Sequence, residues 1–270
     1  MRNLVLTFHS IQDAEWFEDT LRFIGKWYTF GTLDELYDRL ENRNSEPRRM
    51  CFITFDDGER SVYDMVFPIL KRLHISAAMF VSPKNVIEGG AFWFQRMRCL
   101  GASNEEAMKD KPLADILAYI HKLDPQDATN VNENINKDMF DTLVTSGLIT
   151  FGAHTQNHPI LANETDAISS AEICDSVREL ERLLGSKVRY FAYPNGSRRD
   201  FSEREVETLH QCGVVMAFST IPGYATNKEM YAIQRIGITY GTRWHILLKL
   251  LFPKAFVSIR HWKSRLLRKI

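Results

Sequence analysis

The sequence has no long apolar run and few cysteines. No uninterrupted stretch approaches the roughly 18 apolar residues that a membrane-spanning helix needs. The opening MRNLVLTFHSI turns polar too early for a secretory signal, so we expect a cytoplasmic protein. The cysteines form no CxxC pair, which predicts free thiols in a reducing compartment rather than a disulfide framework; they are Cys51, Cys99, Cys174 and Cys212.

Acidic residues are absent beyond Glu229. From Met230 onward the chain carries nine Lys and Arg residues, which leaves 25 basic against 34 acidic residues, a net charge of −9, for the rest. An acidic body with a basic tail raises the question of what the tail contacts.

The tail at 241–270 reads GTRWHILLKLLFPKAFVSIRHWKSRLLRKI, and Pro253 is expected to split it into two short helices. Basic, aromatic, amphipathic helices suit an anionic membrane surface, where each Lys or Arg contributes roughly 1 kcal/mol. The alternative is that the apolar face packs on the protein body. A nucleic-acid partner is not expected, because no nucleic-acid-binding fold accompanies the tail.

The body alternates between predicted strands and helices, which favours an α/β fold with a mainly parallel sheet or barrel. Strands are expected at 4–10, 27–30, 50–57, 75–81, 148–154, 188–194 and 214–220. Helices are expected at 14–24, 32–40, 61–73, 139–147, 168–185 and 202–213. The stretch 83–137 interrupts this alternation and is interpreted as an inserted helical lobe. Its Trp93 and Phe94 either stack on a sugar ring or form a local core.

Polar clusters follow three of these strands. Asp56 and Asp57 end the third strand before Gly58, GAHTQNHP occupies 152–159, and YPNG occupies 193–196. The carboxyl ends of parallel strands share one face, where sites are built. His154 and His158 are four residues apart and, with one aspartate, would make a metal site that leaves a position open for water.

At these motifs the sequence resembles the polysaccharide deacetylases with the NodB-homology domain, carbohydrate esterase family four. The matching stretches are FITFDDG, GAHTQNHPIL and VRYFAYPNGS, with LVLTFHSI before them and YAIQRIGI after. The resemblance covers roughly residues 2–240 except the insert, and it implies a distorted (β/α) barrel. It also implies metal-dependent removal of an acetyl group from a sugar.

The resemblance assigns different roles to the two adjacent acids. Asp56 would be the general base, while Asp57, His154 and His158 would hold zinc or a similar divalent ion. A bound metal polarises the acetyl carbonyl and lowers the pKa of water, and a separate free carboxylate must accept the proton.

In the third motif, Asn195 corresponds to the position whose backbone N–H helps form the oxyanion hole. Tyr193 is grouped with it as a substrate-contacting residue.

Two departures from the family pattern matter. The usual arginine before the proline of the third motif is replaced by Ala192 and Tyr193, as in many cell-envelope relatives. Arg235 could supply the positive partner of Asp56; the alternative is a surface arginine beside a late strand. No Leu-x-His motif follows at the carboxyl end, and His9 resembles the catalytic acid of permuted members such as the biofilm poly-N-acetylglucosamine deacetylases. The alternative is that His9 only caps a strand.

We therefore expect residues 1–240 to be a deacetylase barrel with an insert at about 83–137, followed by the tail. Its substrate would be an acetylated sugar of a surface polysaccharide or of a lipid-linked precursor at the inner face of the membrane. One alternative is a non-catalytic glycan-binding or scaffold barrel. Another is a metal-dependent hydrolase of a non-sugar C–N bond.

Overall fold

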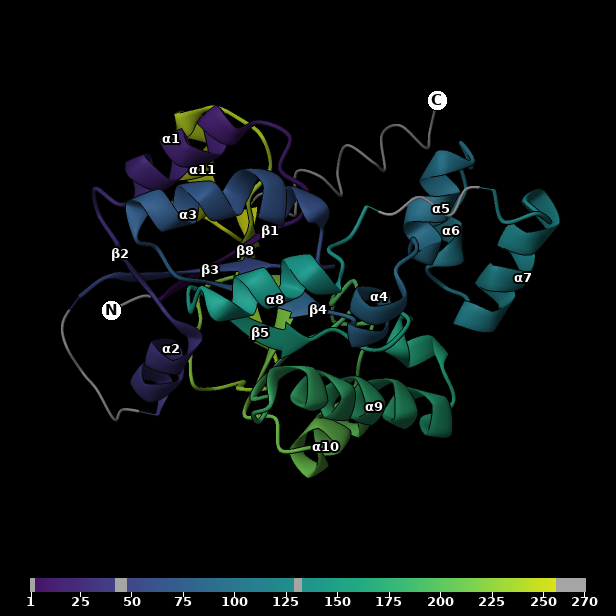
Figure 1. The fold of residues 1–270 in the computed structure, drawn as a ribbon. Coiled ribbons are helices and arrows are strands. Elements are labelled where there is room, and N and C mark those ends of the chain that lie inside the picture. The colour runs from purple at the N-terminus through teal and green to yellow at the C-terminus, as the bar shows by residue number, and fades with distance from the viewer. Residues whose placement is uncertain (1–2, 42–47, 129–132, 256–270) are drawn as a thin grey trace.

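The computed structural model describes residues 3–41, 48–128 and 133–255. Within them the chain forms eight parallel strands with helices around them (Figure 1). The strands are β1 (Leu4–Phe8), β2 (Thr29–Gly31), β3 (Met50–Phe55), β4 (Ala77–Val81), β5 (Ile149–Ala153), β6 (Tyr190–Ala192), β7 (Met216–Pro222) and β8 (Ile233–Gly237).

The helices cover the outside of the strands and fill the connection between β4 and β5 (Figure 1). They are α1 (Ala14–Ile24), α2 (Leu33–Leu40), α3 (Phe67–Leu73), α4 (Pro83–Glu88), α5 (Trp93–Cys99), α6 (Glu105–Met108), α7 (Leu113–Leu123), α8 (Lys137–Thr145), α9 (Asp166–Leu184), α10 (Glu203–Gln211) and α11 (Arg243–Leu251).

The sheet closes into a barrel because β1 pairs with both β8 and β3. The closed order is β1-β8-β7-β6-β5-β4-β3. The short β2 pairs with the first half of β3, through residues 50–52, while β4 pairs with its second half, through residues 54–55. This uneven pairing confirms the predicted distorted (β/α) barrel.

Side chains alternate between the two faces of each strand, as the extended backbone requires. One face contributes to a core inside the barrel, which includes Val5, Phe52, Phe80, Tyr190 and Phe218. The other face packs under the helices, with Leu6, Ile53, Met79, Phe151 and Phe191. Residues that continue the inner series at the ends of the strands therefore point toward the axis of the barrel.

Local sequence signals explain several helix boundaries. Thr32 and Glu35 form a capping box at the start of α2, and Ser202 and Glu205 form one at the start of α10. The helix expected at 61–73 is not uniform, because a π-helical stretch at Val62–Val66 precedes α3. Pro68 in the first turn of α3 has no N–H to donate, which favours a break in the α-helical pattern here.

The helices between β4 and β5 have a small core of their own. Trp93 and Phe94 are buried in it together with Met97, Ile116 and Ile120. Their burial supports the local-core alternative over stacking on a sugar ring.

The prediction of free cysteines is wrong for one pair. A disulfide joins Cys174 on α9 to Cys212 at the end of α10, whereas Cys51 and Cys99 are free. The sequence spacing gave no sign of this pair, because helix packing brings together residues 38 positions apart.

In the tail, α11 ends just before Pro253 as predicted. The second predicted helix falls largely on residues 256–270, outside the described residues. None of the described helices combines the length and apolar character needed to cross a membrane.

Gly152 provides a test of the barrel interior. A Cβ at this position would lie 2.6 Å from ring atoms of Phe80 and 2.8 Å from the carbonyl oxygen of Tyr190. We expect Gly152→Ala to lower the free energy of unfolding by about 1–3 kcal/mol, measured by urea denaturation, because the crowded core must shift. Gly237→Ala is the matched control, since its nearest neighbour is a Thr7 methyl at 4.0 Å. Equal effects of the two substitutions would contradict this packing.

Candidate functional site

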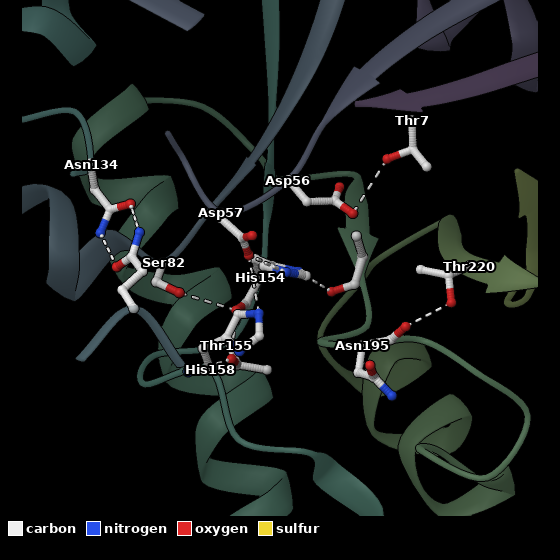
Figure 2. Close-up of polar contacts among 12 residues, drawn as sticks. Thr7, Asp56, Asp57, Ser82, Asn134, His154, Thr155, His158, Asn195 and Thr220 are labelled. Atoms are coloured by element: carbon white, nitrogen blue, oxygen red, sulfur yellow. Dashed lines mark hydrogen bonds and ion pairs between the residues drawn. The ribbon is translucent and has the colours of Figure 1, made fainter. Parts of the chain in front are cut away.

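Three buried side chains meet at the carboxyl ends of β3 and β5. Oδ1 of Asp57 lies 3.3 Å from Nε2 of His154 and 3.1 Å from Nε2 of His158 (Figure 2). One donor atom from each residue lies within 4.8 Å of the other two. The structure thus brings together the three residues that the sequence predicted as metal ligands.

The backbone around this triad adopts a conformation that is rare for residues with side chains. Asp57, Thr155, His158 and Asn195 all have φ between 57° and 68°. Each such residue costs about 1–3 kcal/mol and persists only where the surrounding structure imposes this conformation. The left-handed turn takes Asp57 out of the strand alternation, so its carboxylate reaches the two histidines.

Hydrogen bonds from neighbouring segments hold these loops in place. The Ile135 N–H donates to the carbonyl oxygen of Gly58 (2.8 Å). A single carboxylate oxygen of Glu172 on α9 accepts from the N–H groups of Gln156 and Asn157 (both 2.9 Å). The strained turns are therefore supported from outside the site.

Each histidine is oriented by further contacts. Nδ1 of His154 donates to the carbonyl oxygen of Ala192 on β6 (2.7 Å), which directs Nε2 toward Asp57. The His158 ring packs against Phe92 and Phe94, with centroids 5.2 and 4.9 Å away, and the indole N–H of Trp93 donates to its carbonyl oxygen (3.0 Å). The insert thus forms the wall behind His158.

The electrostatics of the triad suit a cation. Burial raises the pKa of Asp57, but hydrogen bonds from His154 and His158 outweigh it and hold that pKa well below its usual range. Burial also lowers the pKa of His158, which favours the neutral imidazole that metals bind. For His154 burial lowers the pKa, but the hydrogen bond to Asp57 together with the negative charges of Asp56 and Asp57 outweighs it, and the pKa is raised.

A carboxylate and two oriented imidazoles fit a divalent ion such as zinc, with coordination positions left for water or substrate. The buried Nδ1 of His158 has no hydrogen-bond partner among the described residues.

Asp56 has a different environment from its neighbour. It continues the inner series of β3, and Arg235 on β8 donates to both of its oxygens, at 2.7 Å each. Arg235 is fully buried inside the barrel and also donates to the carbonyl oxygen of Ser219 (2.8 Å) and to Oγ1 of Thr54 (3.1 Å). The alternative of a surface arginine is therefore wrong.

Arg235 determines the protonation of Asp56. Burial raises the pKa of the Asp56 carboxyl, but the charge and hydrogen bonds of Arg235 outweigh it, and the pKa lies below its usual value. The lowered pKa keeps the Asp56 carboxylate ionised at neutral pH. Its oxygens accept hydrogen bonds from Arg235 and Thr7, and from none of Asp57, His154 and His158 among the described residues.

His9 lies at the end of β1 and is exposed. Its charge helps to lower the pKa of Asp56 and offsets part of the rise in the pKa of Glu59, so His9 lies near both. It has no hydrogen bond to any described residue.

Glu59, which our sequence reasoning did not select, is buried beside the site. Burial, together with the charges of Asp57 and Glu133, raises the pKa of Glu59 to about 7. Its place directly after the DDG motif was the only available signal.

The third motif is divided between two faces. Asn195 donates through its side chain to Asp200 (2.6 Å) and its carbonyl oxygen accepts from Thr220 (2.6 Å) (Figure 2), while its N–H has no partner among the described residues. Tyr193 instead packs under the helices. Its hydroxyl donates to the carbonyl oxygen of Tyr231 (2.9 Å) and its N–H to that of Phe218 (3.1 Å). This placement does not support the predicted substrate contact of Tyr193.

Comparison with known proteins agrees with these motifs. A family model described as polysaccharide deacetylase matches residues 43–217. The poly-beta-1,6-N-acetyl-D-glucosamine N-deacetylase of Staphylococcus epidermidis is 30% identical over 208 residues, which cover 77% of this chain and 60% of that protein. The Bacillus subtilis protein YxkH, also named for polysaccharide deacetylation, is 21% identical over 201 residues, or 74% and 55% of the two chains. The chain therefore spans less than two thirds of the length of either relative.

Solved structures show the same fold. The Streptococcus pyogenes deacetylase PplD, in complex with acetate, superposes with a TM-score of 0.69 at 18% identity and covers 92% of this chain and 97% of its own. IcaB from Ammonifex degensii gives a TM-score of 0.65 at 22% identity, with coverage of 88% and 92%. From the family match and the Staphylococcus epidermidis relative we conclude that this chain belongs to the polysaccharide deacetylase family.

Proposed function

We propose that this protein is a metal-dependent deacetylase that removes an N-acetyl group from a sugar of a surface polysaccharide or of its precursor. The observation that carries the proposal is the division between two adjacent carboxylates. Asp57 points at His154 and His158, whereas Asp56 is held by Arg235 and stays separate. Hydrolysis at a metal needs both a ligand set and an unliganded base.

Each residue has a defined task in this reaction. Zinc or a similar ion, held by Asp57, His154 and His158, would polarise the acetyl carbonyl and lower the pKa of water. Asp56 accepts the proton of the attacking water, and Arg235 keeps its carboxylate charged and fixed in orientation.

Two further residues complete the proposed chemistry. The unpartnered N–H of Asn195 donates to the carbonyl oxygen as negative charge develops there. His9, exposed at the end of β1, transfers a proton to the departing amine.

The substrate class is supported by a named relative. The Staphylococcus epidermidis protein is named as an N-deacetylase of a poly-N-acetylglucosamine, which favours an N-acetylated sugar here. A position at the inner face of the cell membrane, with a lipid-linked sugar as substrate, is supported by the basic tail at 241–270. The Cys174–Cys212 disulfide opposes a cytoplasmic location, because disulfides are typical of oxidising compartments.

Metal content tests the ligand set. After exposure to zinc and removal of loose ions, we expect about one ion per chain, because three oriented donors hold zinc tightly. His158→Ala should lose this ion, as measured by mass spectrometry of the metal. His121→Ala, which alters an exposed histidine of α7, is the control and should retain it. Retention of zinc in His158→Ala would contradict the proposed ligand set and would favour the non-catalytic barrel instead.

Turnover tests the base. Asp56→Asn keeps the shape of the side chain but cannot accept the proton, so we expect kcat on acetylated glucosamine oligomers to fall by about 10²–10⁴. Zinc content should stay at the wild-type level, because Asp56 is not a ligand. Asp64→Asn, at an exposed position of the π-helix, should leave both quantities unchanged. Loss of zinc in an Asp56→Asn protein whose circular dichroism shows that it is folded would mean that the two acids have been assigned in the wrong order.

A further inference from the structure

Exposed large apolar side chains are concentrated on one part of the surface. Eleven such side chains occur among the described residues, and six of them are scattered over the chain. The remaining five fall between positions 240 and 252 and are Tyr240, Trp244, Leu248, Leu251 and Phe252. We call this group the α11 face.

The helix α11 is apolar on two sides. Ile246 and Leu250, four residues apart, are buried against the barrel. Trp244, Leu248 and Leu251 follow the spacing i, i+4, i+7 and form a second stripe that is 74%, 45% and 49% exposed. The outer side of a surface helix is normally polar, so packing within the described chain leaves this second stripe unexplained.

The α11 face begins at the rim of the barrel, meaning the carboxyl ends of its strands. Tyr240 follows β8 by three residues, and its ring lies 5.3 Å from that of Trp16. The Trp16 indole donates to the carbonyl oxygen of Gly241 (2.8 Å), which ties this aromatic corner to the start of α1. Asp56 and His9 lie on the same rim, because they follow β3 and β1.

From that rim α11 continues down the outer flank of the barrel. Its last turn is held by the Tyr224 hydroxyl, which contacts the carbonyl oxygens of Leu250 and Leu251 at 2.8 and 3.0 Å. Figure 1 shows α11 beside α1 and β8, on the outside of the strands. The α11 face therefore runs along one side of the molecule and reaches the rim where the candidate site lies.

The segment that carries the α11 face, 240–255, has charges of one sign only. Its charged residues are Arg243, Lys249 and Lys254, and Glu229 is the last acidic residue of the whole sequence. The remaining segment 256–270 adds five more basic residues and again no acid. Asp19 of α1 pairs with Arg243 at 3.1 Å, and both side chains are exposed.

We propose that the α11 face docks side-on to an anionic lipid bilayer. The rim of the barrel, where the candidate site lies, would then be next to the lipid headgroups. Trp and Tyr prefer the membrane–water boundary, where Leu and Phe enter the acyl region and Lys and Arg contact anionic headgroups. A second copy of the chain fits less well, since it would bring two basic segments together. A sugar attached to a lipid would then reach Asp56 from the side of His9; this consequence rests on the proposed function, whereas docking does not.

Co-flotation of the full-length protein with vesicles tests the docking. The vesicles contain phosphatidylcholine mixed with phosphatidylglycerol, or phosphatidylcholine alone. We expect the wild type to float with the anionic vesicles, and Trp244→Ala/Leu248→Ser to lose at least about tenfold in partition coefficient. The control Trp27→Ala/Leu123→Ser removes a tryptophan and a leucine that are each 46% exposed elsewhere, and should float like the wild type.

Folding and activity are measured on the same samples. Both double variants should keep the wild-type unfolding midpoint and the wild-type rate on a soluble acetylated oligosaccharide, so failure of docking can be distinguished from failure of the proposed function. Equal flotation of the wild type and Trp244→Ala/Leu248→Ser would overturn the proposal. So would a wild-type dimer that dissociates in this variant without any binding to vesicles, because the occupant would then be a second copy.

Discussion

A single buried ion pair constrains the rest of the site. Arg235 and Asp56 are 179 residues apart in sequence, yet they meet inside the barrel through two hydrogen bonds of 2.7 Å. Removing one partner from such a pair costs about 3–5 kcal/mol, because the remaining charge is left buried and uncompensated. The barrel must therefore close with β8 and β3 on either side of β1. The carboxylate that Arg235 holds is the group that we propose as the base.

This constraint explains why two acids stand side by side. Asp56 continues the inward series of β3 after Phe52 and Thr54, so it points at Arg235. On a longer strand Asp57 would face the helices, but its φ of 68° turns it back toward the two histidines. Folding of the barrel offsets the strain at Asp57. The insert and α9 hold the loop that carries His154 and His158. One dipeptide can then serve both a proton acceptor and a metal ligand.

Local pattern predicted much of this arrangement. Alternating apolar residues located the strands, and polar clusters at their ends identified Asp56, Asp57, His154 and His158. The sequence alone could not decide whether Arg235 contacts Asp56 or lies on the surface, because no local pattern distinguishes an inward-pointing arginine from a surface one. Three features were not predicted. The Cys174–Cys212 disulfide depends on how α9 and α10 pack together. The burial of Glu59 and the outward packing of Tyr193 depend on which face of the chain a single residue takes. Such long-range contacts leave no periodic trace in a single sequence.

A crystal structure of the zinc-loaded protein tests the division of roles between Asp56 and Asp57 most directly. We expect one ion at about 2.0–2.2 Å from a carboxylate oxygen of Asp57 and from an imidazole nitrogen of both His154 and His158. Asp56 should stay outside the coordination sphere, with both oxygens still bound by Arg235. An ion ligated by Asp56, or an Arg235 side chain turned away from it, would contradict the division of roles between the two acids.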